Sequence, residues 1–340
     1  MKKVVLVILL LISIFASSCN KENKGAKEEY VTITFDTSLG TPISDEKVVK
    51  ETKANRPNDP IRGGYGFQGW YLNDELFDFD NTTCNDNITL VAKWVPLFTY
   101  SVTREDDKEC LVITGGIKEN IGKTLTIPKE IDGQSVYSIS TYAFKGYEIE
   151  TLEIEEGVQY IDDSAFCECR KLKEVNLPSS VWYYGNHSFA WCDNLKSITI
   201  PDSSRTINVQ ATMLYKTPIE VAKMPAEACV ALTNHSSLVK VEVTSGFRLY
   251  ESSFSGCVKL STITLPNTLR YIEKHVFVNC KNLEKIIIPK KVREVGVLAF
   301  TECPKLTIFC EAESKPSDWS SAWNANDNGT FIPVVWNYTE

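Results

Sequence analysis

The sequence is poor in histidine and has no excess of positive charge. Three of its 340 residues are histidine, and acidic residues outnumber basic ones to give a net charge of −8. Histidine is the commonest metal ligand and the side chain that titrates near neutral pH, so metal and acid–base chemistry have few residues to use. An acidic chain without a basic stripe cannot neutralise phosphates, which argues against nucleic-acid binding.

Short motifs that mark catalytic sites are also missing. We find no HExxH zinc motif, no phosphate-binding loop and no nucleophile elbow. Carboxylates are plentiful, but the pairs Glu155–Glu156 and Asp162–Asp163 are typical of solvated turns rather than of a glycosidase acid pair. We therefore predict no catalytic residue, no cofactor and no metal site, and we expect that the protein is not an enzyme.

The N-terminal apolar run is too short to span a bilayer. Val4–Phe15 has twelve residues, whereas a transmembrane helix needs about 20. Two lysines precede the run, and a small-residue segment ending in Cys19 follows it. Residues 1–18 therefore resemble a bacterial lipoprotein signal peptide, which implies cleavage before Cys19 and attachment of lipid to that residue. A plain secretory signal cleaved near Ser18 is the alternative.

Residues 19–29 are polar and contain no core-forming side chain, so we expect a flexible tether between lipid and first domain. The acidic residues after Cys19 resemble the surface-export signal of Bacteroidetes lipoproteins. The expected location is the outer membrane or cell surface, with membrane contact through the lipid alone.

A small domain is predicted over residues 30–96. Val31–Phe35 alternates apolar and polar residues like a half-buried strand, and Ile88–Trp94 reads as a closing strand. Prolines and glycines between residues 57 and 71 prescribe turns. A domain of this size has a small core, so its aromatic residues should supply most of the burial. The predicted core aromatics are Phe35, Tyr65, Phe67, Trp70 and Trp94.

Residues 31–94 resemble the Listeria–Bacteroides repeat, the B-repeat of internalins. The resemblance is carried by the run P-x-D-P-x-R-x-G-Y-x-F-x-G-W-Y and by I-T-L-x-A-K-W at the end. It implies a small β-grasp-like module of extracellular bacterial proteins, usually a spacer or an adhesion unit.

A repeat of 23 residues organises the second half of the chain. Phe254, Phe277 and Phe300 are 23 residues apart, and in each copy a Cys follows the Phe by three residues and a Leu by six. A short run of the form Leu-x-x-Ile-x-Leu then follows. This period and pattern predict a leucine-rich repeat solenoid, in which coils become stable only by stacking on neighbours.

We predict about eight coils over residues 138–310, two of them irregular, with Leu232 in the Phe position of one. Residues 97–137 should form an N-terminal cap and residues 311–340 a C-terminal cap, because the end coils need cover for their apolar faces. The fold class is therefore mainly β, a small β-grasp-like module followed by a capped solenoid.

The repeat resembles the BspA-like leucine-rich repeat family, whose unit reads A-F-x-x-C-x-x-L-x-x-I-x-L-P-x-x-V-x-x-I-G. The resemblance covers Ser138 to about Cys310. Known members are surface proteins of host-associated bacteria, and some bind fibronectin or fibrinogen. The resemblance implies a host extracellular matrix or plasma protein as partner.

Five cysteines share one phase of the repeat: Cys169, Cys192, Cys257, Cys280 and Cys303. Neighbouring coils would bring their Cα atoms to about 5 Å, within disulfide range, but parallel inward side chains are poorly placed for a bridge. A column of thiols also lacks convergent tetrahedral ligands for zinc. We interpret them as small buried thiols, with disulfides as the alternative in an oxidising compartment. His235 takes a Cys position, and His187 and His275 lie too far apart to share a metal.

The candidate ligand-binding residues lie six and seven positions before each Phe. These two columns should point outward, and they are rich in Tyr, Trp and Arg, the residues that anchor interfaces. The alternative is that the aromatics merely cover the coil edges. The candidates are Tyr160, Trp182, Tyr183, Phe247, Arg248, Arg270 and Tyr271; Gln159, Arg293 and Glu294 share the columns. Separately, Asp163-Ser164-Ala165 resembles a Bacteroidetes O-glycosylation motif.

The sequence supports two functional hypotheses. The first is a monomeric, lipid-anchored adhesin that recognises a host protein through the solenoid surface. The second is a glycan-binding accessory protein of a polysaccharide-uptake system, because aromatic side chains also stack on sugars.

Overall fold

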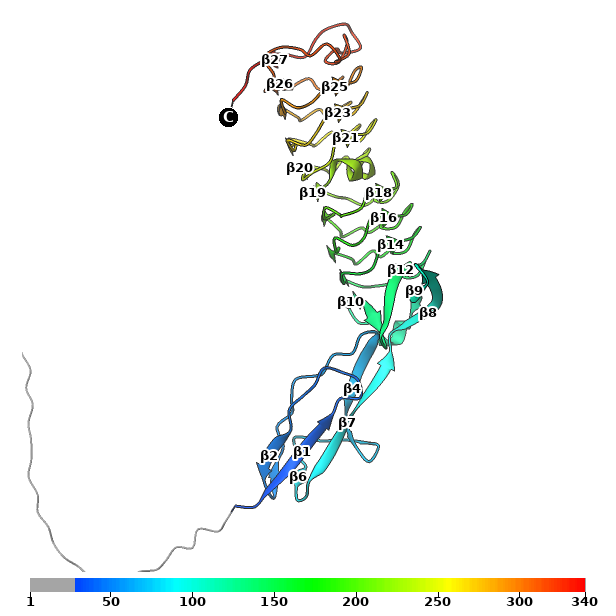
Figure 1. Ribbon diagram of the computed structural model, residues 1–340. Helices are drawn as coiled ribbons and strands as arrows, with labels where there is room; N and C mark the ends of the chain where they lie inside the picture. The colour runs from blue at the N-terminus through cyan, green and yellow to red at the C-terminus, as the bar shows by residue number, and fades with distance from the viewer. Residues whose placement is uncertain (1–27, 340) are drawn as a thin grey trace, which may run out of the picture.

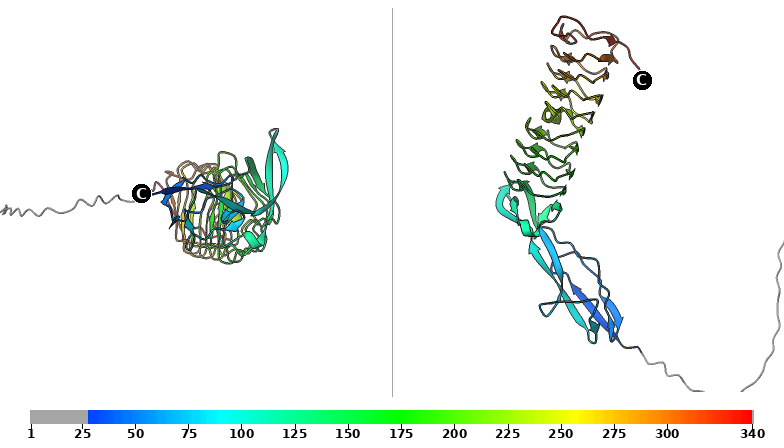
Figure 2. Two further views of the ribbon diagram at one scale, coloured as in Figure 1. Left: turned by 90° about the horizontal axis from the view of Figure 1, so that it is seen from below. Right: turned by 180° about the vertical axis from the view of Figure 1, so that it is seen from behind.

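The computed structural model describes residues 28–339, which form an elongated molecule in two parts (Figure 1). A narrow sheet module occupies one end and a stack of coils forms the rest, and the views in Figure 2 agree on this shape. The expected leader, the lipidation site Cys19 and most of the tether lie outside the described residues. Within residues 28–339, no helix has the length and apolar character needed to cross a bilayer.

Five strands form the main sheet of the N-terminal module, in the order β2-β1-β7-β4-β5. β1 runs parallel to β7, and the other neighbouring pairs are antiparallel. Alternation along β1 turns Val31, Ile33 and Phe35 into the core. The strands are β1 Tyr30–Asp36, β2 Glu46–Val49, β4 Tyr65–Leu72, β5 Glu75–Leu76 and β7 Ile88–Pro96, and β3 Thr52–Lys53 pairs separately with β6 Thr83–Cys84.

Aromatic side chains form the centre of the module, as predicted for four of the five. Trp70 is 1% exposed, and its ring makes edge contacts with Phe35 and Phe67 at centroid distances of 5.0 and 5.5 Å. Trp94 packs against Phe67 at 5.4 Å and donates from Nε1 to the Thr37 carbonyl at 3.0 Å. A small core is thus built from large rings, and the buried Nε1 of Trp70 at its centre has no hydrogen-bond partner among the described residues.

The prediction that Tyr65 belongs to this core is wrong, because Tyr65 packs against the core of the solenoid. It is the first residue of β4 and pairs with Pro96, the last residue of β7, so it lies at the end of the sheet where the chain enters the coils. Its hydroxyl donates to Asp132 Oδ2 at 2.7 Å. The Arg62 guanidinium covers its ring at 3.8 Å and pairs with Asp132 Oδ1 at 2.8 Å.

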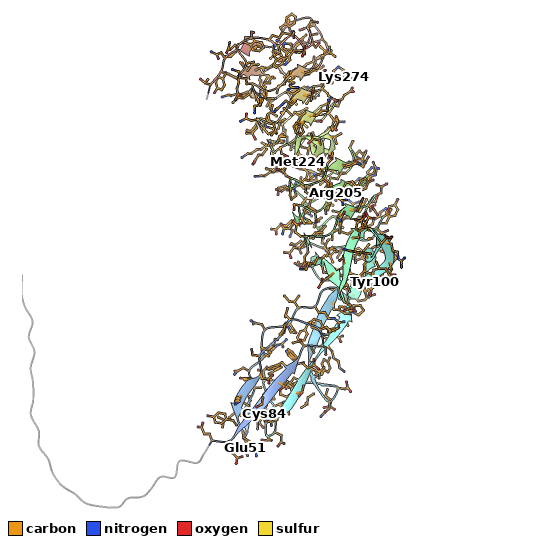
Figure 3. All side chains as sticks on the ribbon, in the orientation of Figure 1. Glu51, Cys84, Tyr100, Arg205, Met224 and Lys274 are labelled. Atoms are coloured by element: carbon orange, nitrogen blue, oxygen red, sulfur yellow. The ribbon has the colours of Figure 1, made fainter. Side chains whose placement is uncertain are left out.

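The solenoid begins with a hairpin and a first coil that lacks the Phe-Cys pattern. The hairpin projects from the side of the rod in Figure 2, and its Tyr100 is labelled in Figure 3. β10 pairs in register with β13, and β9 pairs with β12, so this segment covers the end of the first full coil. Its elements are β8 Phe98–Glu105, β9 Lys108–Gly116, η1 Lys118–Asn120, β10 Thr124–Ile127, β11 Glu130–Ile131 and β12 Gln134–Ile139.

Two ladders of parallel strands run along the stack. The long-strand ladder carries the Leu-x-x-Ile-x-Leu segments: β13 Thr151–Ile154, β15 Glu174–Asn176, β17 Ser197–Thr199, β19 Val221–Met224, β20 Lys240–Val243, β22 Thr262–Thr264, β24 Lys285–Ile288 and β26 Thr307–Cys310. Hydrogen bonds divide it into three sheets, with breaks between β15 and β17 and between β22 and β24. The short-strand ladder continues from β12 through β14 Tyr160–Ile161, β16 Tyr183–Tyr184 and β18 Asn208–Val209, and resumes with β21 Arg248–Leu249, β23 Tyr271–Ile272 and β25 Glu294–Val295.

Eight fully buried side chains form a spine between the ladders, which confirms the predicted stack of coils. Consecutive Phe rings stack face to face at centroid distances of 5.1–5.3 Å. Leu232 holds the predicted position, and Leu214 supplies the coil whose pattern is degenerate. The spine residues are Phe144, Phe166, Phe189, Leu214, Leu232, Phe254, Phe277 and Phe300, each 0% exposed.

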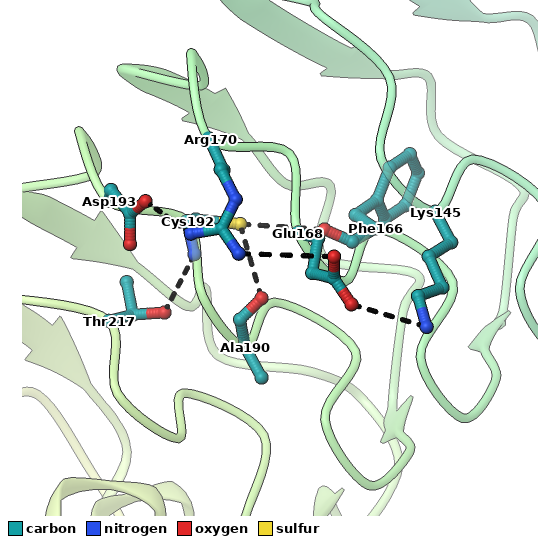
Figure 4. Close-up of polar contacts among 8 residues, drawn as sticks. All are labelled: Lys145, Phe166, Glu168, Arg170, Ala190, Cys192, Asp193 and Thr217. Carbon is teal, nitrogen blue, oxygen red and sulfur yellow. Dashed lines mark hydrogen bonds and ion pairs between the residues drawn. The ribbon is translucent and has the colours of Figure 1, made fainter.

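The cysteines of the repeat are buried free thiols that bond to the backbone of the previous coil. Cys192 Sγ donates to the Phe166 carbonyl at 3.4 Å, as Figure 4 shows. Cys169, Cys257, Cys280 and Cys303 donate in the same way to Phe144, Leu232, Phe254 and Phe277, at 3.0–3.3 Å. Burial raises the pKa of the Cys169 thiol to about 12. The residue type thus serves as a small donor as well as a packing group.

Other donors replace Cys where the repeat departs from its pattern. Thr217 Oγ1 donates to the Phe189 carbonyl at 2.6 Å, and His235 Nε2 lies 3.0 Å from the Leu214 carbonyl. Burial lowers the pKa of His235, which favours its neutral form. In the coil of Phe144, Tyr147 stands three residues after the Phe and donates from its hydroxyl to the Gly116 carbonyl at 2.6 Å.

Three tryptophans close the C-terminal end of the stack. Trp323 contacts the Phe300 ring edge-on at 6.0 Å, Trp319 packs on Trp323 at 4.8 Å, and Trp336 lies 5.9 Å from Trp319. β27 Val334–Val335 pairs with β26 and extends the long-strand ladder by one strand. The last apolar coil is therefore covered by rings.

Candidate binding face

The candidate residues from the two columns lie on the short-strand ladder. Tyr160 pairs in register with Tyr183, and Arg248 pairs with Tyr271. None of the seven candidates is buried, and Phe247 is 62% exposed. The structure groups them into two patches rather than one continuous strip.

The aromatic patch is built on β12, β14 and β16 and contains Tyr137, Tyr160, Trp182 and Tyr183. Ring centroids lie 5.0 Å apart for Tyr137–Tyr160, 4.6 Å for Tyr160–Trp182 and 5.8 Å for Tyr160–Tyr183. Trp182 Nε1 donates to Gln159 Oε1 at 3.4 Å, and the Arg205 guanidinium lies 5.5 Å from the Trp182 ring. These neighbours hold the half-exposed rings in place.

Sequence reasoning missed Tyr137 and Arg205. Tyr137 stands seven residues before Phe144, so the same phase that selected Trp182 could have found it. Burial, and the hydrogen bond with Tyr160, raise its pKa. Arg205 lies in the stretch where the repeat is irregular, and no phase marks it.

The arginine patch is built on β21 and β23 and contains Phe247, Arg248, Arg270 and Tyr271. The Arg248 guanidinium covers the Tyr271 ring at 4.3 Å and pairs with Glu273 at 2.8 Å, so much of its charge is already matched. Arg270 Nη1 donates to three carbonyls of its own turn, at 2.6–3.1 Å, and has no carboxylate partner among the described residues.

A short coil separates the two patches. Successive spine residues are 22, 23, 25, 18, 22, 23 and 23 positions apart, so the coil from Leu214 to Leu232 lacks about five residues. In place of a short strand it has the 3-10 helix η2, Ala226–Leu232. The short-strand ladder is therefore interrupted between β18 and β21.

The Glu227 carboxylate replaces the missing backbone. In regular coils the carbonyl of the previous coil accepts the N–H groups at the ladder, as Gln159 accepts from Trp182 at 3.1 Å. At the interruption, Glu227 Oε1 accepts instead from the N–H groups of Phe247 and Arg248, at 2.8 and 3.4 Å. A side chain thus satisfies donors that the shortened coil would leave unpaired.

The missing corner leaves a hollow of about 420 Å³, which we call the notch. It lies between the two patches, with Arg205 on one side and Phe247 on the other. Its lining residues are Asp202, Ser203, Ser204, Arg205, Thr206, Ile207, Pro225, Glu227, Ser245, Gly246, Phe247 and Thr268. This site was not expected from the sequence, although the short spacing between spine residues is its signal.

The remaining candidates behave differently. His187 stacks on Trp191 at 5.7 Å in the turn that follows β16. We call the face formed by such turns, which include residues 141–146 and 186–191, the turn side of the coils. His275 lies 3.8 Å from Glu251. No group of three or more His, Cys, Asp or Glu side chains in residues 28–339 is placed to hold a metal ion. Ser164 is only 8% exposed, and its N–H donates to the Asn186 carbonyl, so the folded coil has little room for a sugar there.

Two family profiles match the chain. The BspA type leucine rich repeat region matches six copies over residues 123–235 and 228–314. These ranges together span 192 of the 340 residues (314 − 123 + 1). The Listeria-Bacteroides repeat domain matches residues 32–93.

Curated relatives share only a part with this chain. A protein of Evansella cellulosilytica named as a membrane protein is 30% identical over 109 residues, which cover 31% of this chain and 16% of that protein. A second, named as a Gly-rich membrane protein of the same organism, is 27% identical over 109 residues and is covered to 12%. The chain therefore matches less than a fifth of the length of these relatives.

Solved structures with a similar fold include the T. pallidum leucine rich repeat protein, with 24% identity and a TM-score of 0.41. The match covers 62% of this chain and 88% of that one. A leucine rich cell surface protein from Faecalibacterium prausnitzii has 26% identity and a TM-score of 0.44, with coverage of 70% and 60%.

Proposed function

Because the chain belongs to the BspA type leucine rich repeat family, we propose that it is a cell-surface binding protein, an adhesin that recognises a host extracellular protein through the solenoid. The membership supports a protein-binding role. The two patches on the short-strand ladder are the proposed contact surface, and a fibronectin- or fibrinogen-like protein is the proposed partner, following the resemblance of the repeat.

One observation carries this proposal: aromatic rings line up on neighbouring coils and remain half exposed. Tyr160, Trp182 and Tyr183 support one another through ring contacts. Rings that are held in place lose little conformational entropy on binding, and Tyr, Trp and Arg dominate the binding energy of protein interfaces. Coverage of a coil edge alone would not require three half-exposed rings together.

The proposed membrane anchor is a lipid on Cys19. A short tether and the sheet module then act as a spacer between the lipid and the coils. The name of the curated relatives as membrane proteins agrees with a surface location. In this arrangement the module lifts the coils away from the outer membrane, and the contacts of Tyr65 and Arg62 with Asp132 keep the rod aligned with its base.

The test uses the mature chain against a panel of host extracellular proteins. Replacing Trp182, Tyr183 and Tyr271 together with Ala should leave the melting temperature nearly unchanged and weaken binding at least tenfold, since hot-spot residues each contribute 2 kcal/mol or more. The matched control is Tyr142→Ala, because Tyr142 is 59% exposed on the turn side, away from both patches. Unchanged affinity of the triple variant would remove the patches from the proposed surface.

The alternative function, glycan binding in a polysaccharide-uptake system, uses the same kind of side chains. A glycan array, run beside the protein panel, separates the two functions. If the patches bind protein, the triple variant should lose binding to a host protein, and if they bind glycan, it should lose binding to a glycan.

A further inference from the structure

The notch is a built feature of the irregular coils. The long coil from Phe189 to Leu214 contributes residues Asp202–Ile207, and the shortened coil after it leaves the space that these residues face. Asp202 Oδ1 accepts from Thr244 Oγ1 at 2.8 Å and from Ser245 Oγ at 2.6 Å, which joins the two sides across the missing corner. These hydrogen bonds therefore fix the two sides of the hollow relative to each other.

The floor of the notch is fixed as well. Glu227 Oε1 is held by the N–H groups of Phe247 and Arg248. The second oxygen, Glu227 Oε2, lies against Gly246, where an added Cβ would collide with it, and Gly246 has a φ of +97° that favours glycine. The carboxylate thus keeps one anchored oxygen and one oxygen without a hydrogen-bond partner among the described residues.

From these groups we propose that the notch binds a neutral sugar residue of a glycan. Phe247 offers an exposed ring face for the C–H face of a pyranose, and the Arg205 guanidinium offers donors. The free oxygens of Asp202 and Glu227 and the hydroxyls of Ser203, Ser204 and Thr268 accept or donate in turn. A hollow lined by a few polar side chains and one aromatic ring suits a small polar ligand.

The charge of the lining argues for a neutral ligand. One guanidinium stands against two carboxylates, a net of −1 (1 − 2), so an anionic sugar or an acidic peptide would meet repulsion. A basic peptide side chain would meet Arg205, which makes no ion pair among the described residues and lies over Trp182. Hydroxyl groups can both donate and accept, so a sugar uses the carboxylates and the guanidinium together.

Phe247 belongs to both the arginine patch and the notch, whereas Arg205 and Glu227 lie outside the patches. The triple variant of Trp182, Tyr183 and Tyr271 leaves all three notch residues in place, so the two proposals can be tested separately. The experiment is saturation-transfer NMR of the mature chain with neutral oligosaccharides, sialylated and uronic-acid oligosaccharides, and an acidic peptide. Phe247→Ala should weaken binding of the neutral sugar by about three- to tenfold through loss of ring contact. Arg205→Ala should weaken it through loss of donors.

Two control variants sharpen the experiment. Arg293→Ala removes an exposed arginine of the same column, two coils beyond Phe247. Tyr142→Ala removes an exposed aromatic that belongs to neither patch, and neither variant should change sugar binding. Gly246→Ala tests the floor, because displacing Glu227 should weaken the sugar without touching Phe247. The side chains that are replaced are at least partly exposed, and Gly246 has none. Melting curves of all variants check that the fold is kept.

Selective binding of a neutral sugar that is lost in Phe247→Ala and Arg205→Ala, and kept in both controls, supports the proposal whether or not the patches bind protein. The proposal is overturned if no neutral sugar binds at millimolar concentration, if only anionic ligands bind, or if the controls lose binding as much as the notch variants.

Discussion

The carboxylate of Asp132 accepts two contacts from the N-terminal module, an ion pair from Arg62 at 2.8 Å and a hydrogen bond from Tyr65 at 2.7 Å. Asp132 follows β11 in the first coil, so this residue links the two parts of the molecule. The Arg62 side chain is 16% exposed, and that of Asp132 is 39% exposed. The pair is therefore partly shielded from solvent and geometrically fixed by the ring of Tyr65.

Asp132→Ala should loosen the junction while both parts remain folded. The loss of one shielded pair and one hydrogen bond removes the polar link, and Arg62 is left beside Tyr65 without its carboxylate. Pulsed electron resonance between labels on the module and on a distal coil should give a broader distance distribution in the variant. A distribution as narrow as that of the wild type would contradict a role for Asp132 in alignment.

The same junction should loosen in acid. The Arg62 guanidinium and the Tyr65 hydroxyl hold the pKa of Asp132 below its ordinary range. A depressed pKa means that the contact is fully present above the ordinary carboxyl pKa, near pH 4, and is lost as the pH falls through the lower folded value. The label distances should therefore broaden below about pH 4, and Asp132→Asn should be loose at every pH. Equal acid broadening in Asp132→Asn would assign the effect to other groups.

The cysteine column should depend on its donors. Cys280→Ala removes the Sγ that donates to Phe254 and leaves a small cavity, so it should reduce the free energy of unfolding by about 1–2 kcal/mol. Cys280→Thr should lose less, because Thr217 fills the equivalent place in another coil. Urea unfolding followed by circular dichroism measures the difference. Equal losses for both variants would mean that the donor is unimportant.

These thiols should also be inert in the folded protein. Burial raises the pKa of Cys169 and of Cys257 to about 12, so almost no thiolate is present at pH 8. Iodoacetamide should label Cys169, Cys192, Cys257, Cys280 and Cys303 only after unfolding, without prior reduction. Labelling that requires a reductant would show disulfides instead.

Two tyrosines allow a comparison of how a paired and an unpaired buried hydroxyl affect the free energy of unfolding. Tyr184 is fully buried and its hydroxyl has no partner among the described residues, whereas the hydroxyl of Tyr147 donates to Gly116. Tyr184→Phe should raise the free energy of unfolding by about 1 kcal/mol, and Tyr147→Phe should lower it by about 1 kcal/mol. Urea unfolding measures both, and changes of the same sign in the two variants would contradict this assignment.

The sequence predicts the regular part of this fold well because the period is carried by large core residues. The spacing of Phe254, Phe277 and Phe300 fixes the coil length, and the same phase locates the outward columns. Leu214 was missed because its coil has 25 residues before it and 18 after it, which breaks the phase. The notch arises from that break in the phase, so the repeat pattern could not predict it.

The repeat pattern could not predict contacts between segments that lie far apart in the sequence. Tyr65 was assigned to the module core because it stands among other aromatics in the sequence. It is the first residue of β4, however, and therefore packs at the junction with the solenoid. The bond from each Cys to the previous coil depends on backbone geometry at the turn. Composition alone gave these residues a packing role and no donor role.

The proposed function places the partner on the short-strand face of the coils, where the two patches lie. Hydrogen–deuterium exchange of the mature chain, with and without a host protein bound in the panel experiment, tests it most directly. Binding should slow exchange in β14 and β16 and in β21 and β23 and leave exchange in the N-terminal module unchanged. Protection confined to residues 30–96, or to the turn side that carries Tyr142 and Trp191, would contradict it.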